Sequence, residues 1–513
     1  MEIKKEKLHW IENITDKKIQ IETDVDVIVP DSKPDIKKIL QIDANVESAS
    51  CEIQNDRSLV CGNVCFNVIY LPDDSKLVQN IKITTPFTDI IAMNGMDSTM
   101  EGNVEIDVLS INYKILNGRK FSVKCIVESM LKVQKTVETE IVSAIEDNEI
   151  QVKNSEVDIL VRSGRCCKNI VINDRVIVPE SESSIGEVLN VAAKINEYSV
   201  KLINNKAIIK GDIKIICTYA EAVNGEIATV NCVAPYTEIL DIDGIKADDM
   251  CNAQIKVGNC EYNCAESDDG EVRNVEVKCS LIAEVVAFSE VKRVMIDDCY
   301  STRTALNTDF TKIKLPRKIC DINQNDTLKT NIVLTENEPM LERIYDAFSK
   351  AYIEEISVKN NHIIVSGVVD NYVLYVTNDT ETPIYCVKKE VEFSQQFDCN
   401  GSNSLESDIV AEIMNTSYNL NSDNSVDLRV NLKLKGIIYD LSESEVITNV
   451  EKTDVKLKPE SASIVVYFVQ NDETLWDIAK KYYSTVEEIV EINELPERAV
   501  QKGMRLLIPK HKI

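Results

Sequence analysis

The sequence predicts a mainly β protein. We expect three tandem antiparallel β-sandwich or open-barrel modules with short helices, followed by a small α+β domain of order βααβ at the C-terminus. Three observations indicate this class. One pattern of residues occurs three times in the 513-residue chain, apolar and polar residues alternate within each copy, and a different pattern with helical spacing follows near the C-terminus.

The threefold pattern is anchored on one glycine in each copy. A tyrosine follows this glycine by eight residues, an aromatic residue follows it by 25 or 26, and an apolar pair precedes it by 22 and 23. Copies that recur about every 150 residues are too long for a solenoid unit and indicate tandem domains. The glycines are Gly62, Gly211 and Gly367, the tyrosines are Tyr70, Tyr219 and Tyr375, and the aromatic residues are Phe87, Tyr236 and Phe393.

Strands are predicted throughout each copy. Apolar residues recur at every second position in runs such as 121–135, 275–288 and 426–441, which places one face in a core and the other in water. Each copy opens on a segment with apolar residues at i, i+3 and i+4, and a proline stands at or near its start. This spacing predicts one or two helical turns in the segments PDIKKIL, SIGEVL and PMLERIY.

Domain boundaries follow from the extent of each copy and from changes in composition. A polar stretch that contains Pro459 separates the last copy from the C-terminal domain. We expect an N-terminal segment at 1–24, β modules at 25–140, 174–292 and 331–445, connectors at 141–173 and 293–330, a linker at 446–463, and the C-terminal domain at 464–511.

The C-terminal domain is predicted to begin with a strand, IVVYFV, and to end with a return strand, RLLIP, after a turn at Gly503. Asp472 and Glu473 are typical of a helix start. Two helices are expected between the strands, and Pro496 ends the helical region. Their spaced residues are Leu475, Ile478, Ala479 and Tyr482 in the first helix and Val486, Ile489, Val490 and Asn493 in the second.

The three copies contain no pattern of catalytic residues. Phosphate-binding glycine motifs, H-E-x-x-H and G-x-S-x-G do not occur, and the chain has three scattered histidines. The acidic pairs 248–249, 268–269 and 297–298 could act as carboxylate dyads or Ca²⁺ ligands, although solvated turns on an acidic protein explain them more simply. The sequence therefore predicts a protein that is not an enzyme, with no cofactor and no metal.

Charge and cysteine usage restrict the partners and the compartment. The formal net charge of −28 repels nucleic acid, so we expect no nucleic-acid partner. Many of the 16 cysteines lie in alternating runs, which favours reduced, half-buried thiols over a disulfide or a metal site. The first residues have no apolar signal region and no run of 18 apolar residues occurs, so we expect a cytosolic protein without a transmembrane segment.

The stretch from Tyr467 to Pro509 resembles the LysM domain. It carries the family's Thr, Leu, Trp and Asn positions, whereas Asp472 and Glu473 replace the usual Gly-Asp before the threonine. The resemblance implies a groove for N-acetylglucosamine glycans such as peptidoglycan, between the loop entering the first helix and the loop leaving the second. Carried over by position, the groove residues are Asp472, Glu473, Thr474, Leu475, Asn493, Glu494, Leu495 and Pro496, with Trp476 as a further contact candidate.

The three copies, including VIVPDSKPDIKKIL in the first, resemble the SPOCS domains of the SipL family of clostridial coat-morphogenesis proteins, and more loosely bacillary SpoVID proteins. In an endospore former, the mother cell assembles the coat from its own cytosol, so a LysM protein there needs no export signal. The resemblance implies a scaffold in the mother-cell cytoplasm, at the forespore surface in the spore coat.

Such a scaffold would bind the morphogenetic ATPase of the coat basement layer and other coat proteins, and it would tether the coat layers to the forespore. The LysM domain of that family is implicated in contacting the ATPase. The alternative is a cell-wall-associated protein whose LysM domain binds the N-acetylglucosamine glycans of peptidoglycan.

Overall fold

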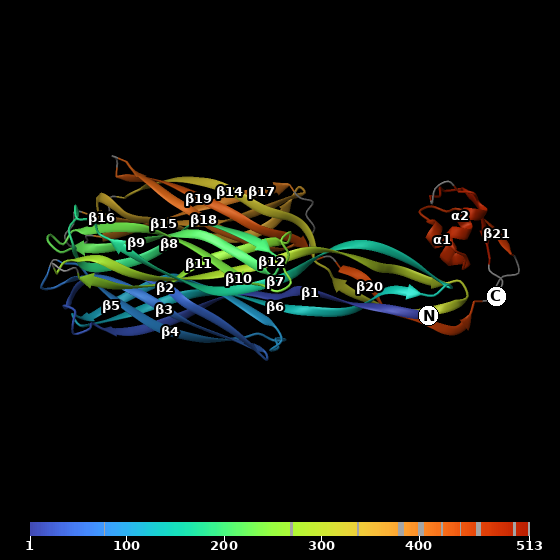
Figure 1. Ribbon diagram of the computed structural model, residues 1–513, viewed down its shortest axis with the longest axis horizontal. Coiled ribbons are helices and arrows are strands. Elements are labelled where there is room, and N and C mark those ends of the chain that lie inside the picture. The colour runs from blue at the N-terminus through green and yellow to red at the C-terminus, as the bar shows by residue number, and fades with distance from the viewer. Residues whose placement is uncertain are drawn as a thin grey trace.

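The molecule is elongated, with a three-module body at one end, a long β stalk, and the C-terminal domain at the far end of the stalk (Figure 1). The computed structural model is described for residues 1–75, 77–266, 270–335, 338–377, 384–398, 405–421, 424–441, 443–457, 463–495 and 499–510. Strands account for 79% of the residues and helices for 3%, which confirms the mainly β class. Within the described ranges, no helix has the length and apolar content to span a membrane.

The first module is a β-sandwich of two three-stranded antiparallel sheets, with strand orders β2-β3-β4 and β1-β6-β5. The inward residues Val64 and Phe66 of one sheet share a buried core with Phe121 and Val123 of the other. The strands are β1 (Glu2–Ile28), β2 (Ile36–Gln54), β3 (Arg57–Pro72), β4 (Gln79–Ala92), β5 (Glu101–Asn117) and β6 (Lys120–Glu146).

The second and third modules repeat this topology, with sheets β8-β9-β10 and β7-β12-β11, and then β15-β16-β17 and β14-β19-β18. The second module contains β7 (Ile150–Ile177), β8 (Ile185–Ile203), β9 (Lys206–Glu221), β10 (Ile227–Asp241), β11 (Met250–Glu266) and β12 (Val272–Ser301). The third contains β14 (Arg317–Val333), β15 (Leu341–Lys359), β16 (His362–Thr377), β17 (Ile384–Asp398), β18 (Leu405–Leu420) and β19 (Ser425–Asp440).

The helices predicted at the start of each module are wrong, because these segments begin the strands β2, β8 and β15. Two β-bulges explain the helical spacing. In β2 the register shifts between Ile36 and Lys38 and again between Ile39 and Gln41, so inward residues stand three apart rather than two. The same pair of shifts occurs in β8 and in β15.

The ranges expected as an N-terminal segment and as connectors consist largely of strands. Residues 2–24 belong to β1, residues 150–173 to β7 and residues 293–301 to β12. The outer parts of β1 and β6 form one antiparallel ribbon, those of β7 and β12 a second, and β13 (Thr304–Lys314) with β20 (Glu443–Lys456) a third.

These three ribbons form the stalk around a common apolar core. Trp10 of β1 lies in this core with residues from both other ribbons, and only 5% of its surface is exposed. Because every ribbon contributes, no single module builds the stalk alone. The buried residues nearest the body are Leu8, Trp10, Ile141, Ile159, Met295, Ile313, Leu315 and Val446.

The modules also contact one another inside the body. The amides of Asn67 and Asn80 donate to the Leu189 carbonyl, at 3.1 and 3.2 Å, and join the first module to the second. Arg343 of the third module donates to the Ile227 carbonyl of the second, and β17 lies against β2 of the first. Three modules in mutual contact bury a central cluster of Ile69, Val78, Leu189, Ala220, Ile227 and Ile384.

The C-terminal domain has the predicted order βααβ, with β21 (Ile464–Phe468), α1 (Leu475–Tyr482), α2 (Val486–Ile492) and β22 (Arg505–Pro509). Thr474 and Thr485 cap the two helices, each in a capping box with an acidic residue three positions later. Three residues of the predicted apolar face of α1 are buried, and the fourth, Tyr482, is partly buried against them. The core comprises Val469, Leu475, Ile478, Ala479, Ile489, Leu506 and Ile508.

Candidate functional site

The loop that enters α1 forms the first side of the predicted groove. Asp472 stands where the related family has glycine, and its φ of 59° is in the left-handed region that glycine favours. The Glu473 carboxylate accepts hydrogen bonds from the Tyr467 hydroxyl, at 2.7 and 2.8 Å, and from the Gln470 N–H, at 2.9 Å. The Gln470 N–H is the main cause that lowers the pKa of Glu473. Glu473 therefore stabilises the conformation of the loop that enters α1.

The loop that leaves α2 forms the second side. The Asn493 amide donates to the carbonyls of Ile489 and Leu507, both at 2.7 Å, and its oxygen accepts from the Leu507 N–H at 2.7 Å. Asn493 thus ties α2 to β22. Glu494 is exposed, with a φ of 50°, and Leu495 packs against the core. Pro496 lies outside the described residues, as do the acidic pair 268–269 and Pro459.

Two further predicted residues point elsewhere. Leu475 is buried in the core with 4% of its surface exposed. Trp476 faces the end of the stalk, where its ring meets the Tyr300 ring edge-on, with centroids 4.9 Å apart. The Trp476 indole N–H donates to an Asp298 carboxylate oxygen at 2.8 Å. Trp476, which the sequence suggested as a glycan contact, therefore makes its contacts within the chain.

The contact between the C-terminal domain and the stalk involves three more bonds. The Lys480 ammonium lies 2.7 and 2.8 Å from the two Asp298 oxygens, and the Tyr300 hydroxyl donates to the Ser484 carbonyl at 2.8 Å. Burial is the main cause that raises the pKa of Tyr300, which keeps this hydroxyl a donor. We name Asp298, Tyr300, Trp476 and Lys480 the docking contact.

Sequence reasoning missed the docking contact. Asp298 appeared only as half of an acidic pair, and Tyr300 lay unremarked within the range expected as the second connector. The two are separated from Trp476 by more than 170 residues, and no local pattern connects them. In the structure, the neighbouring Asp297 instead accepts a hydrogen bond from Ser155 at 2.7 Å.

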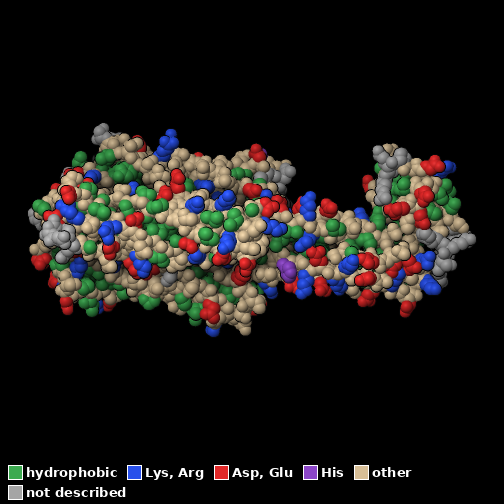
Figure 2. All heavy atoms as spheres, in the orientation of Figure 1, with side chains coloured by type: hydrophobic (Ala, Val, Ile, Leu, Met, Phe, Trp, Pro, Cys, Tyr) green, Lys and Arg blue, Asp and Glu red, His purple; other side chains and the backbone are tan. Residues whose placement is uncertain are grey.

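The C-terminal domain also exposes an apolar surface. Ile464, Val466 and Phe468 of β21 are 49%, 55% and 55% exposed. They alternate with Val465 and Tyr467, which pack against the helices, so they share the opposite face of the small sheet. We name Ile464, Val466 and Phe468 the β21 surface. Elsewhere on the face in view, acidic and basic side chains are intermixed over body and stalk (Figure 2).

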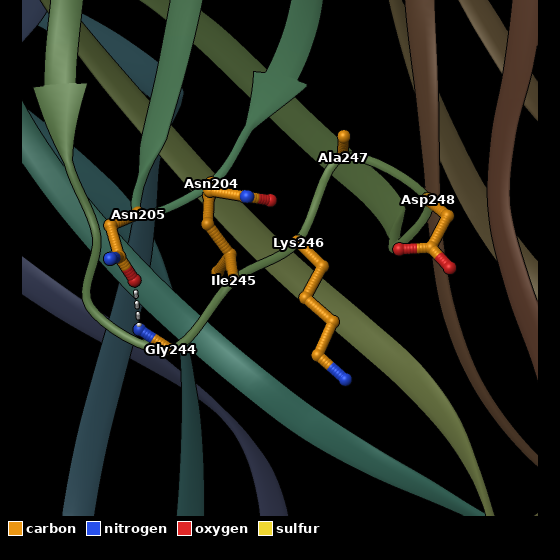
Figure 3. Close-up of a pocket in the computed structure, with 7 residues that line it drawn as sticks. All are labelled: Asn204, Asn205, Gly244, Ile245, Lys246, Ala247 and Asp248. Atoms are coloured by element: carbon orange, nitrogen blue, oxygen red, sulfur yellow. Dashed lines mark hydrogen bonds between the residues drawn. The ribbon is translucent and has the colours of Figure 1, made fainter.

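A shallow depression lies at one end of the second module, between the β8–β9 turn and the loop before β11 (Figure 3). The Asn205 side-chain oxygen accepts from the Gly244 N–H at 2.9 Å and fixes the loop. The first module has the same contact from Asp56 to the Gly95 N–H, at 2.7 Å. The depression is therefore part of a repeated turn structure.

A family model described as the SPOCS domain of SipL matches residues 35–116, 184–265 and 341–421, and a LysM domain model matches residues 467–509. The chain has the SipL-type architecture. It carries three SPOCS domains and a C-terminal LysM domain. No curated protein and no solved structure matches the chain. Neither SPOCS nor LysM is a catalytic domain family.

Each SPOCS match covers four of the six strands of its sandwich, β2 to β5, β8 to β11 or β15 to β18. The strands that flank each match, β1 and β6, β7 and β12, or β14 and β19, complete the second sheet of the sandwich. The stalk is formed by the outer parts of β1, β6, β7 and β12 together with β13 and β20. The SPOCS and LysM domains together indicate a sporulation coat-associated scaffold or a LysM binding role. The role of the nine predicted groove residues stays a prediction.

Proposed function

We propose that this protein is a non-enzymatic scaffold in endospore coat assembly, which binds the morphogenetic ATPase of the coat basement layer and tethers coat layers to the forespore. It would act in the mother-cell cytoplasm, at the forespore surface. The observation that carries the proposal is three SPOCS domains and a LysM domain on one chain. The stalk supports it, because the LysM domain lies at the opposite end from the body (Figure 1) and two partners could be held apart.

The contacts and exposure of the LysM side chains support a protein ligand for this domain. Trp476 is engaged with Asp298, and the Asn493 amide is used within the domain. The β21 surface, in contrast, is apolar and open, as surfaces that bind proteins often are. We propose that the ATPase contacts the LysM domain through this surface.

The test is a fluorescence titration of the full chain in a Trp10→Phe background, in which Trp476 is the remaining tryptophan. Purified coat ATPase and N-acetylglucosamine oligomers are the two titrants. We expect a saturable change with the ATPase and none with the sugar. Phe468→Ser should weaken ATPase binding at least tenfold, whereas Phe310→Ser on the stalk, with a similar exposure of 52%, should not.

The second candidate function is binding of peptidoglycan N-acetylglucosamine glycans by a cell-wall-associated protein. The conformation of Asp472 favours it, because the left-handed backbone of the groove loop is present without the family's glycine. Saturation by the sugar oligomers with no response to the ATPase would support this function and contradict the scaffold proposal.

A further inference from the structure

Two cysteines face each other inside the second SPOCS module. Cys260 of β11 is directly opposite Cys279 of β12 in the antiparallel register, and their sulfur atoms are 3.1 Å apart. Directly opposite residues of antiparallel strands have Cα atoms about 4.5 to 5.5 Å apart, which lies within the range of disulfides. The sulfurs would have to approach by about 1 Å to reach the S–S bond length of roughly 2.05 Å.

A β-bulge next to Cys260 sets this arrangement. The register shifts between Val257 and Cys260, and the Ser280 hydroxyl both accepts from the Asn259 N–H, at 2.8 Å, and donates to the Asn259 carbonyl, at 3.2 Å. A Cβ at Gly258 would lie 2.6 Å from the Ser280 Oγ, so a larger residue there would displace the hydroxyl that makes these two hydrogen bonds. The bulge changes which residues of β11 face inward.

The two thiols differ in their environment. Cys260 is 8% exposed, and Cys279 is fully buried. A hydrogen bond from the Cys279 thiol is the main cause that lowers the pKa of Cys260, and the positive charge of Lys82 from the first module adds to it. The same hydrogen bond and burial raise the pKa of Cys279. Cys260 is therefore the better nucleophile, because the thiolate is the reactive form.

We propose that Cys260 and Cys279 form a redox pair, which a low-molecular-weight disulfide converts to an intramolecular disulfide between β11 and β12. The Cys260 thiolate attacks one sulfur of the small disulfide, so that a mixed disulfide forms and one small thiolate leaves. Cys279 then loses its proton and attacks the Cys260 sulfur, and the second small thiolate leaves. Two protein thiols are oxidised, and one small disulfide is reduced to two thiols.

The disulfide would act where the modules meet. Lys82 of the first module donates to the Cys260 carbonyl at 3.4 Å, and Asn252, also on β11, donates to the Asp408 carbonyl of the third module at 3.3 Å. In the described part of the chain, β11 lies at the edge of its sheet, next to β12. A covalent link to β12 would therefore stabilise the strand that contacts both neighbouring modules.

The test incubates the reduced full chain with oxidised glutathione, blocks remaining thiols, and maps peptides without reduction by mass spectrometry. We expect a linked peptide pair that contains Cys260 and Cys279, and a rise of several degrees in the Tm of the oxidised protein. Cys260→Ser should abolish both results. Cys264→Ser should change neither, because Cys264 is exposed and stands opposite Val275.

Two outcomes would overturn the proposal. In one, the blocking reagent added in urea after the glutathione incubation modifies Cys260 and Cys279 completely, although exposed Cys264 has formed a mixed disulfide with glutathione. In the other, the linked peptide forms but the oxidised protein melts at a lower temperature than the reduced one. Because Cys260→Ser keeps nearly the side-chain volume, circular dichroism of that variant separates loss of the thiol from loss of the fold.

Discussion

At the scale of single residues, the anchors of the threefold pattern are explained by cross-strand contacts. Gly62 is opposite Phe87, and Gly367 is opposite Phe393. The aromatic ring of Phe393 covers the glycine, which has no side chain of its own there, as aromatic residues do beside glycine in other sheets. The anchor tyrosine Tyr375 is buried, and its hydroxyl donates to the Pro339 carbonyl at 3.0 Å.

Replacing an anchor glycine should destabilise the protein. A Cβ at Gly367 would lie 2.0 Å from the Tyr352 carbonyl oxygen and 2.9 Å from the Phe393 ring. We expect Gly367→Ala to lower the free energy of unfolding by about 3 kcal/mol, as measured by urea denaturation. Gly118→Ala is the control, since its Cβ would approach no closer than 3.3 Å, to the Asp35 side chain. Equal losses in the two variants would contradict this explanation.

The pKa of Asp43 should make stability depend on pH. Burial, and to a lesser extent the charge of Asp346, raises the pKa of Asp43 to about 6, although a hydrogen bond from Gln41 opposes the shift. The pKa is higher in the folded than in the unfolded chain, so this contribution favours the folded state at low pH and is lost as pH rises from about 4 to 6.

We therefore expect Asp43→Asn to raise the free energy of unfolding at pH 7.5 by about 2 kcal/mol and to have little effect at pH 4. Urea denaturation at the two pH values measures the difference. Asp31→Asn serves as the control, because the Asp31 side chain is fully exposed. A gain that is the same at both pH values would show that ionisation of Asp43 is not its cause.

At the scale of elements, one strand end holds the LysM domain in place. The last residues of β12 supply Asp298 and Tyr300, and α1 supplies Trp476 and Lys480. The Asp298 carboxylate accepts from both α1 side chains. Asp298, which is only partly exposed at 26%, thus receives three of the four hydrogen bonds of the contact, and Tyr300 makes the fourth.

Asp298→Ala should release the LysM domain from the stalk. We expect Trp476 fluorescence, recorded in a Trp10→Phe background, to shift to longer wavelength as the indole becomes hydrated, and X-ray scattering to show a broader distribution of distances. Asp297→Ala is a matched control one residue away, because the Asp297 carboxylate accepts its hydrogen bond from Ser155 of the stalk. Identical spectra for both variants would argue against the docking contact.

At the scale of the whole molecule, the modules share their cores. The central cluster contains residues of all three SPOCS modules, and the stalk core contains residues of all three ribbons. Stability should then be a property of body and stalk together, unlike in a chain of independent tandem domains. The LysM domain has a core of its own to which Tyr300 is the stalk's contribution.

Calorimetry should therefore show one main unfolding transition for body and stalk. Trp10→Ala should lower the midpoint of this single transition, because it leaves a cavity between three ribbons. The expected loss in free energy of unfolding is about 3–5 kcal/mol. Trp10→Phe should cost much less, since the Trp10 indole N–H is buried without a hydrogen-bond partner in the described structure. Separate transitions of which Trp10→Ala shifts only one would contradict shared cores.

The sequence by itself determined the threefold repeat, the β period of the modules and the βααβ order of the LysM domain. The β period and the order βααβ depend on residues a few positions apart, so local spacing predicts them, and the repeat follows from comparing the chain with itself. Local spacing was misleading where β-bulges placed Ile36 and Ile39 three positions apart on one face of a strand. A bulge and a helical turn leave the same apolar pattern, and only strand pairing distinguishes them.

Only the tertiary structure decided that the long strands continue into a common stalk, that the three modules close on one another, and that Trp476 packs against Tyr300. It also decided that Cys260 and Cys279 face each other. Each of these contacts joins different strands or domains, in several cases more than 100 residues apart. Their partners are chosen by packing and register across the whole molecule, which neighbouring residues in the sequence do not encode.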